Sequence, residues 1–365
     1  MRVLTVVGAR PQFIKAAPVR RALEAVGHEE YLVHTGQHYD DDMSTTHFRD
    51  LELPDPDVNL GVGSGMHGEQ TARMLSRLEP VIAEQAPDWV LVYGDTNSTL
   101  AGALAAVKLH VPVAHVEAGQ RSYNRSMPEE INRVLADHAS DLLLCSTPTA
   151  VANLGVEGLR ENVHLVGDVM IDTLAWMLRP ELPPPNTLAR LGLRPGGYVL
   201  ATVHRAETTD DCARLRAVLD SFARLEETVV FPVHPRTKKA VARLGWTPPP
   251  HVMTIDPAGY RDIIELQRGA RLILTDSGGM QKEAYFLGVP CIVLREQTEW
   301  TEIVEAGWAI LAGADSERIL HAVRSFAPCG PRPMLHGDGH AAQRCVSHLE
   351  HAVSAKPRSS PGGSR

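Results

Sequence analysis

The segment MRVLTVVGARPQFIK (residues 1–15) joins an apolar run to a glycine and then to two cations. The run at residues 3–7 predicts a buried strand, and Gly8 predicts the turn into a helix. Arg10 and Lys15 stand where a nucleotide-binding strand–turn–helix presents its anion-binding groups. The glycine spacing of a dinucleotide site or a P-loop is missing, however. The segment therefore predicts an α/β fold with an anion site of another kind.

Short apolar runs alternate with longer amphipathic stretches along the chain, which is typical of parallel sheets covered by helices on both faces. A proline-rich break at residues 180–185 divides the runs into two series. Two series predict two doubly wound, Rossmann-like α/β domains. The predicted strands are residues 2–8, 30–36, 88–94, 111–117, 141–147 and 163–168, and then 198–204, 228–234, 251–256, 270–276 and 290–295.

Composition and charge narrow the class of protein. The chain has 365 residues, of which 44% are apolar and 22% charged, and these values predict a two-domain globular enzyme. A net charge of −8 argues against a nucleic-acid partner, because nucleic-acid-binding faces are basic. No apolar run approaches the ~18 residues of a membrane helix, and five cysteines without a CxxC pair suit reduced thiols. We therefore expect a cytoplasmic protein with no membrane partner, and a disordered Pro/Gly/Ser-rich tail at 354–365.

Charged residues follow six of the predicted strands. Open α/β sheets bind ligands beyond the carboxyl ends of their strands, so such residues from two sheets favour a cleft between two facing domains. Any one of them taken alone is equally well explained as a helix cap. The six residues are Arg10, Asp95, Glu117, His204, His234 and Asp276.

The segment TDSGGMQKEA (residues 275–284) predicts the start of a ligand-binding helix. Asp276 and Ser277 are helix-capping residue types, and the two glycines that follow let a ligand approach the backbone. The N–H groups of a helix N-terminus suit a diphosphate, and Glu283 could accept hydrogen bonds from two ribose hydroxyls. An ordinary capped helix is the alternative.

The segment HVEAGQRSYNRSMPEEINR (residues 115–133) carries many charges around one strand end and the next helix start. The helix dipole explains acidic residues in a first helical turn, namely Glu129 and Glu130. It does not explain Glu117, which lies between an apolar strand and a glycine. Glu117 is therefore a candidate for catalysis.

The sequence predicts neither a metal nor a cofactor. YDDDM (residues 39–43) contains the D-x-D spacing with which some glycosyltransferases hold a metal, but an acidic solvent-facing turn is favoured. The 17 histidines form no HExxH or similar pattern.

Nine segments together resemble the UDP-N-acetylglucosamine 2-epimerase family, and the resemblance extends from residue 1 to about residue 349. The segments are GARPQFIK (8–15), YGDTNSTLAGALAA (93–106), HVEAGQRS (115–122), MPEEINR (127–133), TVHRAE (202–207), FPVHPRT (231–237), LTDSGGMQKEA (274–284), LREQTEWTE (294–302) and HGDGHAAQR (336–344).

This resemblance implies a glycosyltransferase-B-like fold, with two Rossmann-like domains facing a cleft that holds a UDP-sugar. Residues 1–170, joined by a returning helix at 337–353, would carry the acid/base groups, and residues 171–336 would bind UDP. A homodimer is expected. The catalytic residues that the resemblance implies are Lys15, Asp95, Glu117, Glu129 and His204. The substrate-binding residues that it implies are Arg10, Arg121, Arg205, His234, Asp276, Ser277, Gly278, Gly279, Glu283, Arg295 and Glu299.

The implied reaction interconverts UDP-GlcNAc and UDP-ManNAc without cofactor or metal. UDP leaves C1 first, which makes the C2 proton removable, and a glycal intermediate is then protonated on its opposite face before UDP returns. Removal of a proton from one face of C2 and protonation on the other face require at least two acid/base groups, which clustered carboxylates supply. Cations and N–H dipoles near the departing phosphate would stabilise the charge separation.

Some residues depart from the commonest family pattern. Gln12 replaces a frequent Glu, and Trp300–Thr301 stands where Arg-Pro is typical; these variants resemble the branch that acts on UDP-2,3-diacetamido-glucuronate. Gln120 stands where Leu is usual, and nothing in the sequence explains it. The alternatives to a non-hydrolysing UDP-GlcNAc 2-epimerase are therefore an epimerase for that uronate, a hydrolysing 2-epimerase, a UDP-sugar glycosyltransferase and a non-catalytic UDP-sugar sensor.

Overall fold

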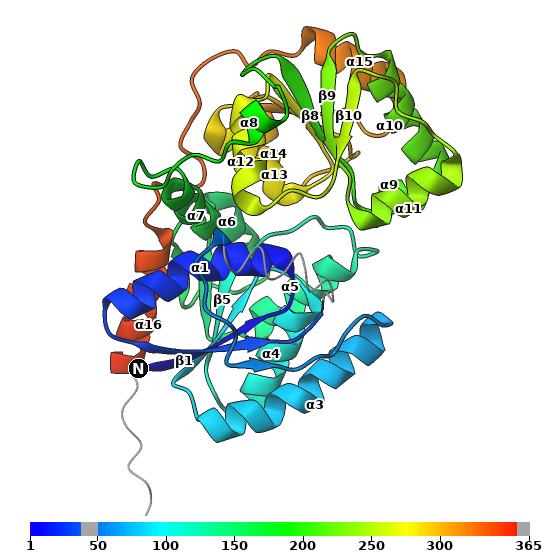
Figure 1. Cartoon of the computed structure of the whole chain (residues 1–365). Coiled ribbons are helices and arrows are strands. Elements are labelled where there is room, and N and C mark those ends of the chain that lie inside the picture. The colour runs from blue at the N-terminus through cyan, green and yellow to red at the C-terminus, as the bar shows by residue number, and fades with distance from the viewer. Residues whose placement is uncertain (38–49, 356–365) are drawn as a thin grey trace, which may run out of the picture. The chain divides into compact units, whose positions relative to one another are not determined.

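The computed structural model describes residues 1–37 and 50–355, and the chain divides into two compact units. Unit 1 comprises Met1–Trp176 and His336–Arg365, and unit 2 comprises Met177–Leu335 (Figure 1). The YDDDM segment and residues 356–365 of the predicted tail lie outside the described residues. No helix in the described ranges is long and apolar enough to cross a membrane.

Unit 1 is built on a parallel sheet of seven strands in the order β3-β2-β1-β4-β5-β6-β7. The order changes direction between β1 and β4, which is where sheets of this kind bind ligands. The strands are β1 (Arg2–Val7), β2 (Glu29–His34), β3 (Val58–Asn59), β4 (Trp89–Tyr93), β5 (Val113–Ala118), β6 (Leu142–Cys145) and β7 (Val163–Leu165).

Helices cover both faces of this sheet (Figure 1). Leu4 and Val6 of β1 share one core with Met74 and Leu78, which lie on helix α3 (His67–Gln85). The opposite face is covered by the first helix, against which the last helix packs. The helices of unit 1 are α1 (Arg10–Ala25), α3 (His67–Gln85), α4 (Asn97–Lys108), α5 (Pro128–Ala139), α6 (Pro148–Val156), α7 (Val169–Met177) and α16 (Ala341–Ala355).

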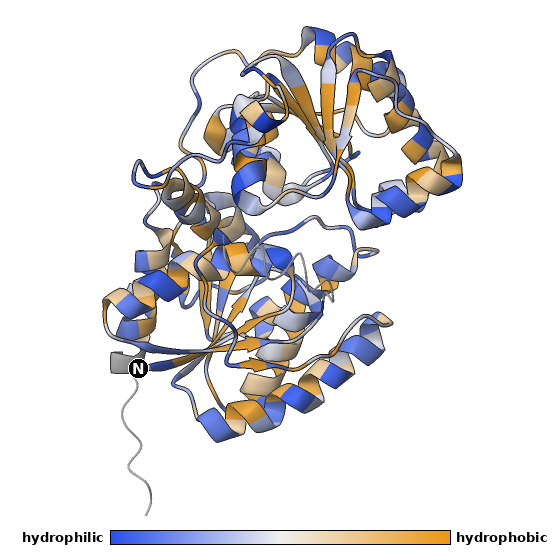
Figure 2. Ribbon diagram, in the orientation of Figure 1, coloured by the Kyte–Doolittle hydropathy of each residue, from blue (hydrophilic) through white to orange (hydrophobic). Residues whose placement is uncertain are grey.

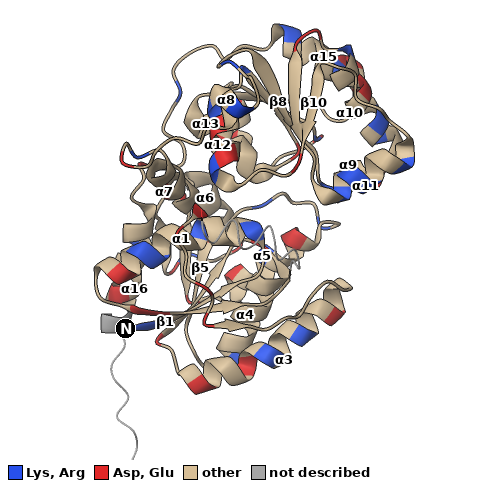
Figure 3. Cartoon of the chain, viewed as in Figure 1, with Lys and Arg blue, Asp and Glu red and all other residues tan. Residues whose placement is uncertain are grey.

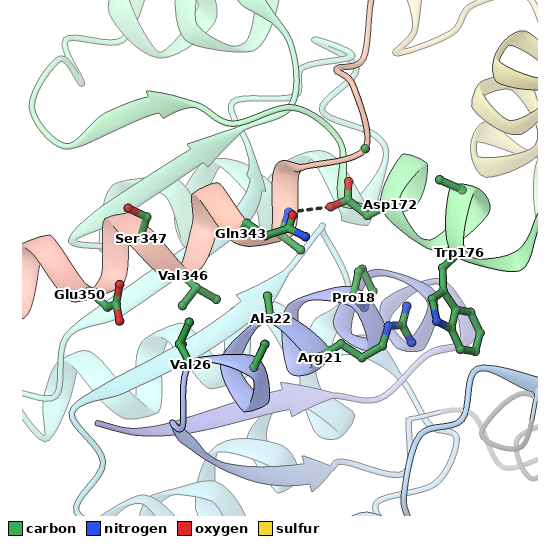
Figure 4. Close-up of a pocket in the computed structure, with 14 residues that line it drawn as sticks. Pro18, Arg21, Ala22, Val26, Asp172, Trp176, Gln343, Val346, Ser347 and Glu350 are labelled. Carbon is green, nitrogen blue, oxygen red and sulfur yellow. Dashed lines mark hydrogen bonds between the residues drawn. The ribbon is translucent and has the colours of Figure 1, made fainter. Parts of the chain in front are cut away.

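The last helix is attached to unit 1 by a capping carboxylate. Asp172 of α7 accepts hydrogen bonds from the N–H groups of Ala341 (3.2 Å) and Ala342 (2.9 Å), two of the N–H groups that a helix N-terminus leaves without intrahelical partners. Figure 4 draws the second of these bonds as a dashed line. A groove of about 560 Å³ lies between α1, α7 and α16, and the guanidinium of Arg21 stacks 4.1 Å from the ring of Trp176 at its edge.

Unit 2 contains a second parallel sheet, in the order β10-β9-β8-β11-β12-β13. Its strands are β8 (Tyr198–Thr202), β9 (Thr228–Pro232), β10 (Val252–Ile255), β11 (Leu272–Thr275), β12 (Cys291–Val293) and β13 (Ala309–Leu311). Helices α10 and α15 share a core with β8 and β9, while α12 and α13 lie on the other face (Figure 1). The helices of unit 2 are α8 (Thr187–Arg190), α9 (Ala206–Thr209), α10 (Cys212–Arg224), α11 (Pro235–Leu244), α12 (Tyr260–Gly269), α13 (Gly278–Leu287), α14 (Thr301–Glu305) and α15 (Ser316–Ser325).

The predicted fold class is confirmed, because each of the eleven predicted strand segments overlaps a strand of one of the two parallel sheets. The strands are apolar and the helices amphipathic, with most charged side chains on helices and loops (Figures 2 and 3). The prediction missed the edge strands β3 and β13, which have two and three residues. A run of two residues, as in β3, carries too little apolar pattern to be recognised.

Candidate active site

Three candidate residues follow neighbouring strands at the carboxyl edge of the unit 1 sheet. Arg10 follows β1 and begins α1, Asp95 follows β4, and Glu117 lies near the end of β5. These positions border the point where the strand order changes direction, as the sequence predicts. Arg10 is half-buried, as is Asp95, whose side chain is 32% exposed.

Lys15 and Glu117 form an ion pair, with 2.5 Å between Lys15 Nζ and Glu117 Oε1. Their side chains are only 8% and 10% exposed. Gly94, at the end of β4, makes room for the pair, because a Cβ added there would lie 2.9 Å from Lys15 Nζ. The structure thus brings together two residues that are 102 positions apart in the sequence.

The backbone of Glu117 has an unusual conformation. The register between β5 and β6 shifts between Val116 and Ala118, so Glu117 is the extra residue of a β-bulge. Its φ of 69° lies in the left-handed region, which costs a non-glycine residue about 1–2 kcal/mol. Strain of this kind persists only where the surroundings enforce it, and it clusters at functional sites.

Asp95 is bound by a residue outside the predicted site. Arg133 of α5 donates one hydrogen bond to Asp95 Oδ2 and another, of 3.0 Å, to Glu130 Oε2. Glu130 also accepts from the N–H groups of Ser122 and Tyr123, both at 2.9 Å. Glu130 is therefore part of the framework that orders residues 122–123.

Glu129 differs from Glu130, its neighbour in the first turn of α5. Its side chain is half-buried and makes no hydrogen bond to the described part of the chain. An acidic residue is favourable at this position because of the helix dipole.

Arg121, predicted to bind substrate, is buried among protein partners. It pairs with Asp137 at 2.7 Å and with both carboxylate oxygens of Glu157, at 2.6 and 2.8 Å. Burial alone would lower the pKa of Arg121, but these two carboxylates raise it above its ordinary value. The guanidinium is thereby assigned to the protein framework rather than to an open surface.

Gln12 is buried at the start of α1 and uses both ends of its amide. Its Oε1 accepts from the N–H groups of Gly8 (2.8 Å) and Ala9 (3.1 Å), and its Nε2 donates to the carbonyl of Tyr93 (2.9 Å). A glutamate here would place an acceptor against that carbonyl. The amide therefore suits this surrounding better than the Glu that is frequent in the family pattern.

In unit 2, Asp276 organises the loop that follows β8. Its fully buried carboxylate accepts from the N–H groups of His204, at 2.9 and 3.1 Å, and of Arg205, at 2.9 Å. His204 Nδ1 lies 3.5 Å from Asp276 Oδ1. Asp276 thus positions His204 and Arg205 through their backbone.

The N-terminus of α13 forms the centre of the unit 2 site. Ser277 caps this helix by accepting from the N–H of Met280, and Gly278 and Gly279 are its first, half-buried residues. A Cβ added to Gly278 would lie 3.2 Å from Trp300 Nε1 and 3.8 Å from an Arg205 Nη2. A glycine backbone, a helix N-terminus and an arginine together are suited to binding a phosphate group.

Glu283, one turn further along α13, is buried between two donors. Its Oε1 accepts from Tyr260 OH at 3.0 Å, and its Oε2 accepts from Gln267 Nε2 at 2.6 Å. These two hydrogen bonds fix the position of the carboxylate on α13.

Arg295 and Glu299 form a bidentate ion pair, with distances of 2.9 and 3.1 Å. Burial would raise the pKa of Glu299, but Arg295, together with Arg205, lowers it to about 2. Glu299 is therefore ionised at neutral pH.

His234 is the N-cap of α11, and its Nδ1 accepts from the N–H of Arg236 at 3.2 Å. Its ring lies 5.7 Å from that of His204, centroid to centroid. The two predicted histidines therefore lie side by side, beyond the neighbouring strands β9 and β8.

The profile of the UDP-N-acetylglucosamine 2-epimerase family matches residues 21–350 of this chain. The chain belongs to the UDP-N-acetylglucosamine 2-epimerase family. It is accordingly an epimerase, that is, an isomerase, as the sequence resemblance implies. 

The relatives of this chain belong to two branches of the family. A UDP-N-acetylglucosamine 2-epimerase homolog of Methanococcus maripaludis is 47% identical over 355 residues, which are 96% of this chain and 99% of the relative. The UDP-2,3-diacetamido-2,3-dideoxy-D-glucuronate 2-epimerase of Pseudomonas aeruginosa is 46% identical over 358 residues, which again are 96% of this chain and 99% of the relative. The crystal structure of Methanocaldococcus jannaschii UDP-GlcNAc 2-epimerase, in complex with UDP-GlcNAc and UDP, has a TM-score of 0.91 and 40% identity, over 96% of this chain and 100% of that chain.

Several residues that contact the candidate active site were not predicted from the sequence. Arg133 could have been found from its spacing, since it lies three residues after Glu130 on the same helix face. His115 and Asp137 could not have been found, because their contact joins a strand to a helix 22 positions away.

Proposed function

We propose that this epimerase interconverts UDP-GlcNAc and UDP-ManNAc by eliminating UDP from C1 and adding it back to the glycal. The observation that carries the proposal is the Lys15–Glu117 pair, in which a lysine fixes a carboxylate on a strained bulge. Glu117 removes or returns a proton at C2, and Asp95 and Glu129 supply the acid/base groups for the opposite face. Lys15 positions Glu117.

The unit 2 residues bind the nucleotide in this proposal. His204, Arg205 and the N–H groups at the start of α13 hold the diphosphate and stabilise its charge as it leaves C1. Glu283 accepts hydrogen bonds from the ribose hydroxyls, and Asp276 positions the loop at 204–205. Support comes from the M. jannaschii relative, whose structure is in complex with UDP-GlcNAc and UDP.

UDP-2,3-diacetamido-glucuronate is the second candidate substrate. It is favoured by the Pseudomonas relative, which is 46% identical over nearly its whole length. Trp300, whose indole nitrogen lies against Gly278, also stands where the commoner family pattern has arginine.

A direct comparison of the two sugars tests the proposal. The protein is incubated separately with UDP-GlcNAc and with UDP-2,3-diacetamido-glucuronate, and the C2 epimers, free UDP and free sugar are followed by proton NMR. The proposal expects UDP-ManNAc to form while UDP stays attached. Turnover of the uronate alone would assign the chain to the second branch, and equal amounts of free UDP and N-acetylmannosamine would identify a hydrolysing enzyme.

A further inference from the structure

A fully buried network of charged side chains lies behind Glu117 in unit 1. His115 of β5 and Asp137 of α5 have no exposed side-chain surface, and Arg121 is 1% exposed. His115 Nδ1 lies 2.7 Å from Asp137 Oδ1, and His115 Nε2 lies 2.7 Å from the carbonyl oxygen of Gly94. The imidazole therefore faces an oxygen at each of its nitrogens.

Both of these oxygens are acceptors. The Gly94 carbonyl cannot donate, and Asp137 is ionised, because its other oxygen accepts from Gly119 N–H (3.1 Å) and from Arg121 (2.7 Å). Burial alone would raise the pKa of Asp137, but His115 and Arg121 hold it below its ordinary value. A neutral imidazole has one N–H and could satisfy only one of the two oxygens.

We propose that His115 is a buried, doubly protonated imidazolium, and that with Asp137 and Arg121 it holds Glu117 in its left-handed conformation. The network binds the backbone that directly follows Glu117. Asp137 accepts from Gly119 N–H, and Arg121 donates to the carbonyl of Gln120 at 2.7 Å. His115 binds Gly94, against which the Lys15–Glu117 pair packs. The functional part of this inference rests on the proposed role of Glu117.

The charges around His115 balance. His115 and Arg121 carry two positive charges, and Asp137 and Glu157 carry two negative charges, so the network is neutral as a whole. Cys145 of β6 also faces Asp137, and burial, followed by the charge of Asp137, raises the pKa of its thiol to about 12. The thiol therefore stays neutral and leaves the balance unchanged.

Nitrogen-15 NMR of histidine-labelled protein measures the charge state directly. The His115 signals are assigned by their absence in His115→Gln, and both ring nitrogens should be protonated at about pH 7.5, where a free histidine is neutral. In Asp137→Asn, one ring nitrogen should lose its proton. The kcat for C2 epimerisation should then fall about 10-fold or more, with KM and the Kd for UDP nearly unchanged.

Glu30→Gln is the matched control, because it also turns a buried carboxylate of unit 1 into an amide, but one bonded to Thr5 and Arg20. It should keep both His115 signals and the kcat. An unprotonated ring nitrogen in the unmodified protein, or an undiminished kcat in Asp137→Asn, would overturn the inference. The NMR measurement on the unmodified protein needs no substrate, so it is independent of the proposed function, which fails instead if neither sugar is epimerised.

Discussion

The ammonium of Lys15 lies 2.5 Å from the carboxylate of Glu117, and this pair joins the second turn of α1 to the bulge that ends β5. Each partner is about nine-tenths buried, so removing either would leave the other poorly compensated. The contact gives Glu117 a fixed side-chain position on a backbone that the surrounding network holds under strain.

Glu117→Gln should abolish epimerisation while leaving UDP affinity within about twofold, because the proposed contact of Glu117 is with the sugar and not with the nucleotide. The amide has the size of the carboxylate but cannot take a proton from C2. Turnover is measured by NMR, and UDP binding by calorimetry. A fully active Glu117→Gln variant would show that the acid/base assignment is wrong.

Glu283→Gln should have the opposite effect and weaken UDP binding by about 1–2 kcal/mol, because one ribose-accepting oxygen is replaced by a donor. The substitution should be tolerated by the fold. Gln267 Oε1 has no hydrogen-bond partner in the described structure, so its amide can flip and accept from the new side chain. Calorimetry with UDP checks this, and unchanged affinity would remove Glu283 from the nucleotide site.

Gly8→Ala should destabilise the protein by about 1–3 kcal/mol, the usual cost of overpacking. A Cβ at this position would overlap Thr35 Oγ1 and Ser98 Oγ, which bond each other at 2.8 Å. Urea unfolding measures the change.

Gly68→Ala is the control for that substitution. Gly68 lies in the first turn of α3, and a Cβ there would meet nothing within 4 Å. Because alanine favours helix more than glycine does, this variant should be about 0.5–1 kcal/mol more stable. Equal effects of the two substitutions would contradict the packing described around Gly8.

Glu30 should make stability depend on pH. Its side chain is 1% exposed, and burial raises its pKa from 4.5 to about 6 against the opposing effects of Thr5 and Arg20. The folded state therefore binds the proton more tightly than the unfolded state. This contribution to stability is complete below about pH 4.5 and is lost as the pH rises through 6.

Comparison with Glu30→Gln isolates this effect from other titrating groups. The free energy of unfolding of the variant, minus that of the unmodified protein, should rise by about 2 kcal/mol between pH 4.5 and pH 7. Urea titrations at several pH values measure the difference. A difference that stays constant, or that falls with pH, would mean that burial of Glu30 does not raise its pKa.

The fold could be predicted from the sequence because most of the longer strands are apolar runs that end at a glycine or a charged residue. Some of the candidate residues could be predicted for a related reason. They follow parallel strands, and the carboxyl ends of parallel strands lie at the same edge of their sheet. Glu117 stood out because neither an apolar strand nor a glycine turn needs a carboxylate.

The pairing of these residues could not be predicted. Arg121 and Arg133 are alike in the sequence, but the structure places one among Asp137 and Glu157 and the other against Asp95. Such contacts depend on helix and strand packing across long stretches of chain. The left-handed conformation of Glu117 was equally hidden, because the extra residue of a bulge has no signature when one strand alone is considered.

Deuterium incorporation at C2 shows whether Glu117 and the other carboxylates move the C2 proton. The protein is incubated with UDP-GlcNAc in D₂O, and both epimers are recovered and analysed by NMR and mass spectrometry. In the proposed reaction, the C2 proton is lost to a carboxylate that exchanges with solvent, and another group returns a deuteron. Deuterium is therefore expected at C2 of UDP-ManNAc, and none is expected with Glu117→Gln. Epimerisation that leaves the original proton at C2 would contradict the proposed role of the carboxylates.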